Sequence, residues 1–206
     1  MKTLLAVLLS LLAVTAQAAA PAPDAIVKNA TEDLRKQISA NHDQYKANLP
    51  AFYKVVDDKV VPHFDVPYIG KLVLARNWKT ASDDQRTRFQ TAFKDMLIKA
   101  YANALLDNYD AVDVAWAPLR MTADTTDVTV NSTLNRKAGP PIHISFLMHE
   151  ADGDWKIYDV LIENVSLVSN FRAQFTSEIK KTSLDDVIKR MESGELAAQP
   201  QQGGAK

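Results

Sequence analysis

The sequence predicts an α+β fold in which helices flank one curved, four-stranded antiparallel sheet with an internal apolar cavity. In the N-terminal half, apolar residues recur at three- and four-residue spacing, as they do in helices. Between Val112 and Asn164 the period changes to two, which is typical of strands. Helical spacing returns after Ser166. The order of helices, sheet and helices indicates a single α+β domain.

The first residues have the composition of a secretory signal peptide. Lys2 precedes an apolar segment, Leu4 to Val14, that is too short to cross a bilayer. Ala16-Gln17-Ala18 then fits an A-x-A cleavage site. We therefore expect residues 1–18 to be removed on export and residues 19–196 to form one soluble domain. In a Gram-negative cell, this places the protein in the periplasm.

Composition excludes some classes of protein. The chain has no cysteine, so its domain must hold without disulfides, which a chain of this length can do by burying about 70% of its unfolded surface. The formal net charge is -1, from 24 basic and 25 acidic residues, and removal of Lys2 makes it -2 (23 against 25). This balance argues against a nucleic-acid-binding protein, which is expected to carry a clustered basic face.

Three helices are predicted before Ser82. The first begins behind a candidate N-cap at Asp24, and the second runs from Pro50 to Pro62, because proline is tolerated in a first helical turn but not inside a helix. The third runs from Val66 to Arg76 with Asp65 as its N-cap. Their apolar stripes are, in order, Ile26, Val27, Ala30, Leu34 and Ile38; Phe52, Tyr53, Val56 and Val60; and Ile69, Leu72 and Val73.

The fourth helix has the clearest sequence signals. Ser82 and Gln85 have the spacing of a capping box, and acidic residues follow Ser82 at the positive end of the helix dipole. Its stripe is Phe89, Phe93, Leu97, Tyr101 and Leu105, widened by Ala92, Met96, Ala100 and Ala104. A stripe this wide suits either an ordinary core or the wall of a ligand cavity.

Four strands are predicted to form an antiparallel meander, and Asp152-Gly153 is a hairpin signal between the last two. The strands are Val112–Met121, Asp127–Arg136, Ile142–Glu150 and Trp155–Asn164. In the last strand, simple alternation places Trp155, Ile157 and Leu161 on one face and Tyr158, Val160 and Ile162 on the other. Both faces are then apolar, so the second must meet more protein or an apolar ligand.

Helices resume after Ser166, with an apolar stripe that includes Phe171 and Phe175. Ser183 and Asp186 predict the start of a further short helix, which ends before Gly194. Residues 197–206 are rich in Gln, Gly and Ala, and we expect them to form a disordered tail.

Motifs for catalysis or metal binding are missing from the sequence. His42, His63, His143 and His149 are scattered and do not have metal-ligand spacing. There is no G-x-S-x-G elbow, no phosphate-binding P-loop and no cysteine nucleophile. We therefore expect no metal and no cofactor.

Asp159 is the one candidate catalytic residue, because it lies within an apolar strand. In the first interpretation, it is the base of a small-molecule isomerase or hydrolase with an apolar pocket, as in ketosteroid isomerase. In the second, its carboxylate is hydrogen-bonded to backbone or to an arginine for structural reasons.

Residues 155–160 (WKIYDV) and 165–175 (VSLVSNFRAQF) resemble the closing motif of the MlaC, or toluene-tolerance, family of periplasmic phospholipid-binding proteins. His63-Phe64-Asp65, Trp78 and the segment from Gln85 to Tyr101 resemble the family in the same order, so that the resemblance extends from Asp24 to Met191. In two departures, Asn164 replaces a usual glycine and Phe171 a usual tyrosine.

The resemblance implies a non-enzymatic carrier with bound phospholipid as its cargo. Such a carrier shuttles lipid between an inner-membrane ABC-type lipid-transport complex and an outer-membrane lipoprotein complex, and so maintains outer-membrane lipid asymmetry. An enzyme using Asp159 and an adaptor or chaperone without a stored ligand are the alternatives. We expect the lipid to lie between the sheet and the helices, lined by Phe93, Leu97, Tyr101, Val130, Ile144, Phe146, Met148, Tyr158, Val160, Ile162, Val165 and Phe171.

Overall fold

The computed structural model describes residues 21–122 and 124–198 and has the predicted α+β arrangement. The signal peptide predicted for residues 1–18 lies outside the described residues, as does the predicted tail from residue 199 onward, whereas Ala198 is buried. The elements are α1 (Pro23–Ala47), α2 (Leu49–Lys59), the 3₁₀ helix η1 (Val61–His63), α3 (Val66–Leu74), α4 (Arg76–Thr80), α5 (Asp83–Asn108), β1 (Val112–Trp116), β2 (Asp127–Arg136), β3 (Ile142–Ala151), β4 (Asp154–Ile162), β5 (Val165–Ser166), α6 (Leu167–Lys181) and α7 (Leu184–Glu192).

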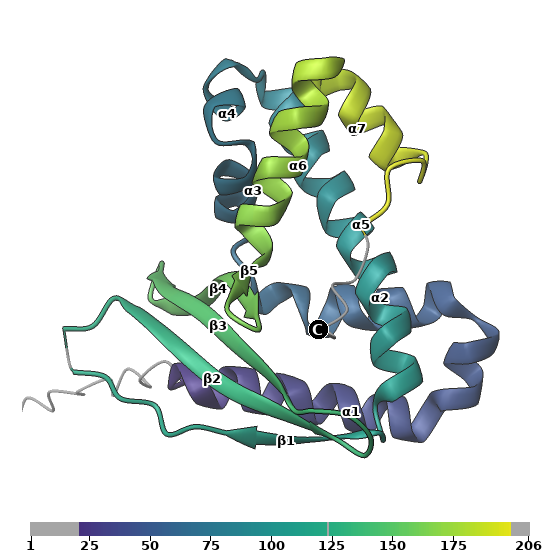
Figure 1. Cartoon of the computed structure of the whole chain (residues 1–206), viewed down its shortest axis with the longest axis vertical. Coiled ribbons are helices and arrows are strands. Elements are labelled where there is room, and N and C mark those ends of the chain that lie inside the picture. The colour runs from purple at the N-terminus through teal and green to yellow at the C-terminus, as the bar shows by residue number, and fades with distance from the viewer. Residues whose placement is uncertain (1–20, 123, 199–206) are drawn as a thin grey trace, which may run out of the picture.

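The sheet is antiparallel, and its strands lie side by side in chain order from β1 to β5. Within the described residues it has five strands, one more than the four predicted, and the additional strand is the two-residue β5. Helix α1 runs along one face of the sheet, while α3, α4, α6, α7 and the first part of α5 form a helical lobe above it (Figure 1). We call the face toward α1 the inner face and the opposite one the outer face.

Local capping signals explain most of the helix starts. The Asp65 side chain accepts a hydrogen bond from the Tyr68 N–H at 2.9 Å, and the capping box of Ser82 and Gln85 has both of its bonds, as predicted. The predicted cap at Asp24 is wrong, because the N-cap is Ala22 and α1 begins at Pro23, two residues before the start that a cap at Asp24 implies. Asp24 instead lies in the first turn and pairs with Lys28 at 2.8 Å.

The predicted ends of the second and third helices need correction. Helix α2 ends at Lys59, and the chain continues as η1 instead of remaining α-helical to Pro62. Helix α3 ends at Leu74 because Ala75 has a positive φ of 48° with ψ of -111°, a conformation that a helix cannot contain. Arg76, the predicted last residue of the third helix, is instead the first residue of the separate helix α4, which was not predicted.

The first strand is shorter than predicted and ends at Trp116 instead of Met121. The Ala117 N–H still bonds to the Asn131 carbonyl at 3.0 Å, but Pro118 follows and has no N–H to donate. The two middle strands and the Asp152-Gly153 turn agree with the prediction, and both turn residues have positive φ (54° and 84°).

A β-bulge at Tyr158 overturns the predicted faces of the last strand. Ile157 pairs with Met148 and Asp159 pairs with Leu147, which leaves Tyr158 as an extra residue without a partner across the strand. Alternation restarts after this residue, so Val160 and Ile162 join Trp155 and Ile157 on the inner face. Asp159 and Leu161 are on the outer face.

A tight corner joins β4 to α6. Glu163 and Asn164 have φ of 50° and 63°, a pair of left-handed residues that reverses the chain into β5. The Asp159 carboxylate then fixes the start of α6: its Oδ1 accepts hydrogen bonds from the N–H groups of Val160 (2.8 Å) and Val168 (3.1 Å), and its Oδ2 accepts one from the Ser166 hydroxyl. Ser166 also caps α6 by accepting from the Ser169 N–H at 2.9 Å.

The buried apolar residues form three separate clusters among the described residues, whereas a domain usually has one contiguous core. The lobe cluster joins α3, α5, α6 and α7, the second cluster joins α1, α2 and α5, and the sheet cluster joins Val27 of α1 to the inner face. Helix α5 belongs to two clusters. Its second stripe of Ile98, Ala102 and Leu106 is buried against α1 and α2, whereas Leu105 of the predicted stripe is 44% exposed.

The corner gives a first prediction. Asn164→Val should lower the free energy of unfolding by about 1–2 kcal/mol, because a β-branched side chain is strained at a left-handed φ. Asn164→Gly should be neutral or stabilising. Urea unfolding of both variants and the wild type measures the difference, and equal stabilities of the Val and Gly variants would contradict the assigned φ.

The Asp159 contacts give a second prediction. Asp159→Ala should lower the free energy of unfolding by about 2–4 kcal/mol, because the buried Val168 N–H and the Ser166 hydroxyl lose their charged acceptor. Ser166→Ala should cost only about 1 kcal/mol, the usual cost of a lost N-cap. If Asp159→Ala changed the unfolding free energy by less than Ser166→Ala, the carboxylate would not be the anchor of α6.

Candidate functional site

The inner face of the sheet has an apolar surface that is only half buried. Val128, Val130 and Met148 are buried in the sheet cluster together with Val27, near the N-terminal end of α1. Farther along the same face, the pairing register brings together apolar side chains that are half buried. We call these residues the apolar wall: Leu134, Ile142, Ile144, Phe146, Val160 and Ile162.

A pocket of about 520 Å³ lies between α5, α6 and the segment that follows α7. Helices α5 and α6, which supply four of the lining residues, diverge toward the sheet (Figure 1). The size of the pocket is within the range of small-molecule sites, about 300–1,000 Å³. The lining residues are Tyr101, Asn170, Phe171, Gln174, Glu195, Leu196 and Ala197.

The twelve residues predicted to line a lipid cavity fall into distinct groups. Tyr101 and Phe171 come together at the pocket, although they lie far apart in the sequence. Ile144, Phe146, Val160 and Ile162 lie in the apolar wall, while Val130 and Met148 are buried beside it in the sheet cluster. Phe93 and Leu97 belong to the lobe cluster, Val165 on β5 is 45% exposed, and Tyr158 is on the outer face.

Tyr158 belongs to a polar and aromatic group that the sequence alone did not indicate. His149 Nε2 lies 2.9 Å from Asp65 Oδ2, and the His149 ring lies 4.7 Å from the ring of Tyr68 and 5.2 Å from that of Tyr158. Burial raises the pKa of the Tyr158 hydroxyl, and the nearby carboxylate of Asp127 acts in the same direction. This group attaches the start of α3 to β3 and β4 on the outer face.

The neighbouring residues explain how the segment between α2 and α3 meets the sheet. Phe64 forms a parallel bridge with Ile157, and the Asp65 N–H donates to the Ile157 carbonyl at 2.9 Å. Burial lowers the pKa of the His63 imidazole, and the positive charge of Lys156 lowers it further. The run His63-Phe64-Asp65 thus attaches the segment between α2 and α3 to β4, along the edge of β4 that does not pair with β3.

The geometry of Asp159 favours its structural role over that of a base. Both carboxylate oxygens accept hydrogen bonds at the start of α6, and the side chain is on the sheet face opposite the apolar wall. A substrate held against the wall would therefore be separated from this carboxylate by the sheet.

Two further features bear on function. Within residues 21–122 and 124–198, no group of three or more His, Cys, Asp or Glu side chains is arranged to hold a metal ion. Among the helices in the same ranges, none has the length and hydropathy needed to cross a membrane.

Comparison with known proteins gives relatives that cover most of the chain. Toluene tolerance protein Ttg2D of Pseudomonas putida is 27% identical over 168 residues, which make up 81% of this chain and 77% of the relative. The intermembrane phospholipid transport system binding protein MlaC of Haemophilus influenzae is 25% identical over 202 residues, or 96% of this chain and 93% of the relative.

A solved structure shares the fold. The phospholipid-binding protein from Ralstonia solanacearum, determined in complex with a phospholipid, matches with a TM-score of 0.76 and 31% sequence identity. The match covers 84% of this chain and 96% of that one. The family model described as MlaC protein matches residues 28–193. Because that match includes more than half of the sequence, this chain belongs to the MlaC family.

Proposed function

We propose that this protein is a periplasmic carrier that binds a phospholipid between its sheet and its helices. The observation that carries the proposal is the apolar wall, whose residues remain half buried and of which Phe146 and Val160 pack against the sheet cluster. An extended apolar surface of this kind usually marks a binding site. The relatives named for phospholipid binding and transport support the same function.

The chemistry of the cargo matches such a surface. Each buried CH₂ group contributes about 0.8 kcal/mol, so two acyl chains of about fifteen carbons lose on the order of 20 kcal/mol when they are exposed to water. A carrier must therefore cover nearly the whole of both chains. The pocket at Tyr101 and Phe171 has the volume for part of a phospholipid, and the apolar wall would supply the remaining contact surface.

We further propose the route of the lipid, on the basis of the family. The carrier accepts or delivers phospholipid at an inner-membrane ABC-type transport complex and at an outer-membrane lipoprotein complex, and so maintains outer-membrane lipid asymmetry. The lipid is cargo and no cofactor takes part. Export by the predicted signal peptide would bring the protein to the compartment between these two membranes.

Lipid extraction tests the proposal directly. The protein, purified without detergent and then incubated with phospholipid vesicles, should release phospholipid into organic solvent, and mass spectrometry would identify it. A protein of the same size without an apolar cavity, treated in parallel, controls for lipid that adheres to surfaces. Absence of phospholipid both before and after incubation would reject the carrier function.

Substitutions on the two sheet faces locate the site. Val160→Arg places a charge on the apolar wall and should lower lipid loading several-fold, since a buried unpaired charge is costly. Ser145→Arg is the matched control, because Ser145 precedes Phe146 on β3 and is on the outer face. Loading is measured as phospholipid per folded protein, with folding checked by circular dichroism. Equal loading of the two variants would remove Val160 from the site.

A further inference from the structure

Helices α3 and α4 form an unusually basic part of this nearly neutral chain. Residues 66–82 contain Lys71, Arg76 and Lys79 but no Asp or Glu. All three side chains are exposed, and none forms an ion pair with a residue that the structure describes. Arg76 and Lys79 are three residues apart in α4 and therefore are neighbours on its surface.

Two arginines from other helices add to this charge. Arg172 of α6 donates from Nε to the Leu72 carbonyl at 2.7 Å. Arg86 of α5 donates from Nε and Nη2 to the Trp78 carbonyl at 3.1 and 2.9 Å, and its guanidinium lies 5.2 Å from the centre of the Trp78 ring. We call these five cations the basic face: Lys71, Arg76, Lys79, Arg86 and Arg172.

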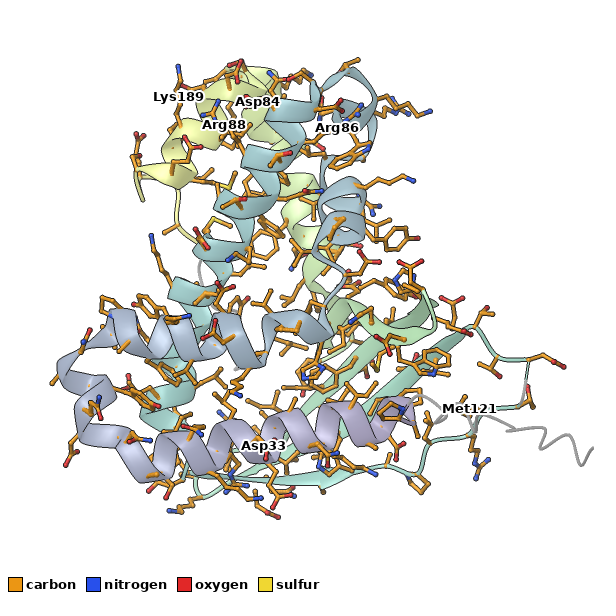
Figure 2. All side chains as sticks on the ribbon, turned by 180° about the vertical axis from the view of Figure 1, so that it is seen from behind. Asp33, Asp84, Arg86, Arg88, Met121 and Lys189 are labelled. Carbon is orange, nitrogen blue, oxygen red and sulfur yellow. The ribbon has the colours of Figure 1, made fainter. Side chains whose placement is uncertain are left out.

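Acidic side chains offset little of this charge. Asp83 pairs with Arg86 at 2.9 Å and is the one carboxylate in an ion pair with a described residue of the basic face. Arg88, on the other side of the top of the lobe in Figure 2, differs because it lies within 4 Å of the carboxylates of Asp84, Asp185 and Glu192. The net charge of the basic face is therefore positive, although that of the whole chain is -1.

We propose that the basic face docks on a phospholipid bilayer with anionic head groups, an inference that rests on the proposed carrier function. A carrier of phospholipid has to approach the membranes that hold its cargo, and clustered Lys and Arg residues are attracted to anionic leaflets. Trp78, half buried under Arg86, is the aromatic residue type that is enriched at membrane interfaces.

The composition of the basic face favours a lipid surface over a protein partner. Protein interfaces usually have an apolar centre surrounded by polar residues. The large apolar residues that are exposed in the described chain, Leu105, Met121 and Val165, all lie outside residues 66–82. The basic face thus presents charge without an apolar centre, as expected for contact with head groups.

Vesicle sedimentation tests the inference. Wild-type protein should bind vesicles of phosphatidylcholine mixed with phosphatidylglycerol but not vesicles of phosphatidylcholine alone, and binding should weaken as salt increases. The variant Lys71→Gln, Arg76→Gln, Lys79→Gln should bind the anionic vesicles on the order of a hundredfold more weakly, because each cation near an anionic surface contributes about a fivefold factor.

The chain offers a matched control with the same change in net charge. Lys59, Lys99 and Lys137 are also exposed and have no ion pair in the described residues. They lie outside residues 66–82, on α2, in the second half of α5 and directly after β2. The variant with Gln at all three should bind the anionic vesicles about as well as the wild type does. Equal loss in both triple variants would mean that net charge alone matters and would overturn the assignment to the basic face.

Failure of the inference can be distinguished from failure of the proposed function. Each preparation is also extracted and its phospholipid content measured. Wild-type protein that contains phospholipid but ignores anionic vesicles would overturn the docking surface and leave the carrier function intact, and the basic face would then be assigned to an acidic protein partner. Protein that neither contains nor takes up phospholipid would reject the carrier function itself.

Discussion

The extra residue at Tyr158 determines which side of the sheet every later residue of β4 occupies. Without this bulge, Asp159 would share the inner face with Trp155 and Ile157, where a carboxylate among apolar side chains is costly. With it, Asp159 lies on the outer face at the start of α6, and Val160 lies on the inner face. One inserted residue therefore places Asp159 where its carboxylate can anchor α6, and it places Val160 and Ile162 in the apolar wall.

Hydrogen bonds and apolar contacts are divided between the two faces of β4. On the outer face, Asp159 fixes α6, and the pair of Asp65 and His149 fixes α3. Arg172 joins these two helices through the Leu72 carbonyl. On the inner face, the apolar wall consists of hydrocarbon side chains, and Ser132 beside them donates to the Ile144 carbonyl at 3.2 Å. The positions of α3 and α6 are thus set by directional bonds on the face that does not hold the proposed ligand.

The sequence predicted those caps and turns that depend on a few adjacent residues. It did not predict features that depend on contacts between residues far apart in the chain. The capping box at Ser82 and the Asp152-Gly153 turn depend on a few adjacent residues, and both were found where the sequence predicts them. The break at Ala75 was not predicted, because alanine is the residue most favourable to helices and no local signal marks it. For the candidate site, simple alternation along the third predicted strand puts Ile142, Ile144 and Phe146 on one face, as the structure does. Alternation misplaced Tyr158 on the last strand, since a bulge is visible only once the partner strand is known.

The division between the faces also suits a ligand of variable length. Hydrogen bonds are directional and lose much of their strength when their geometry changes, so the bonds on the outer face favour one arrangement of α3, α6 and β4. Apolar contacts depend mainly on the area removed from water and can form again around a chain of a different length. Because the buried apolar residues of the described chain form three separate clusters in place of one core, the inner face could adapt to a lipid while α3 and α6 keep their attachment to the sheet. In this protein, a binding site for acyl chains would therefore combine fixed helices on one face of the sheet with adaptable apolar contacts on the other.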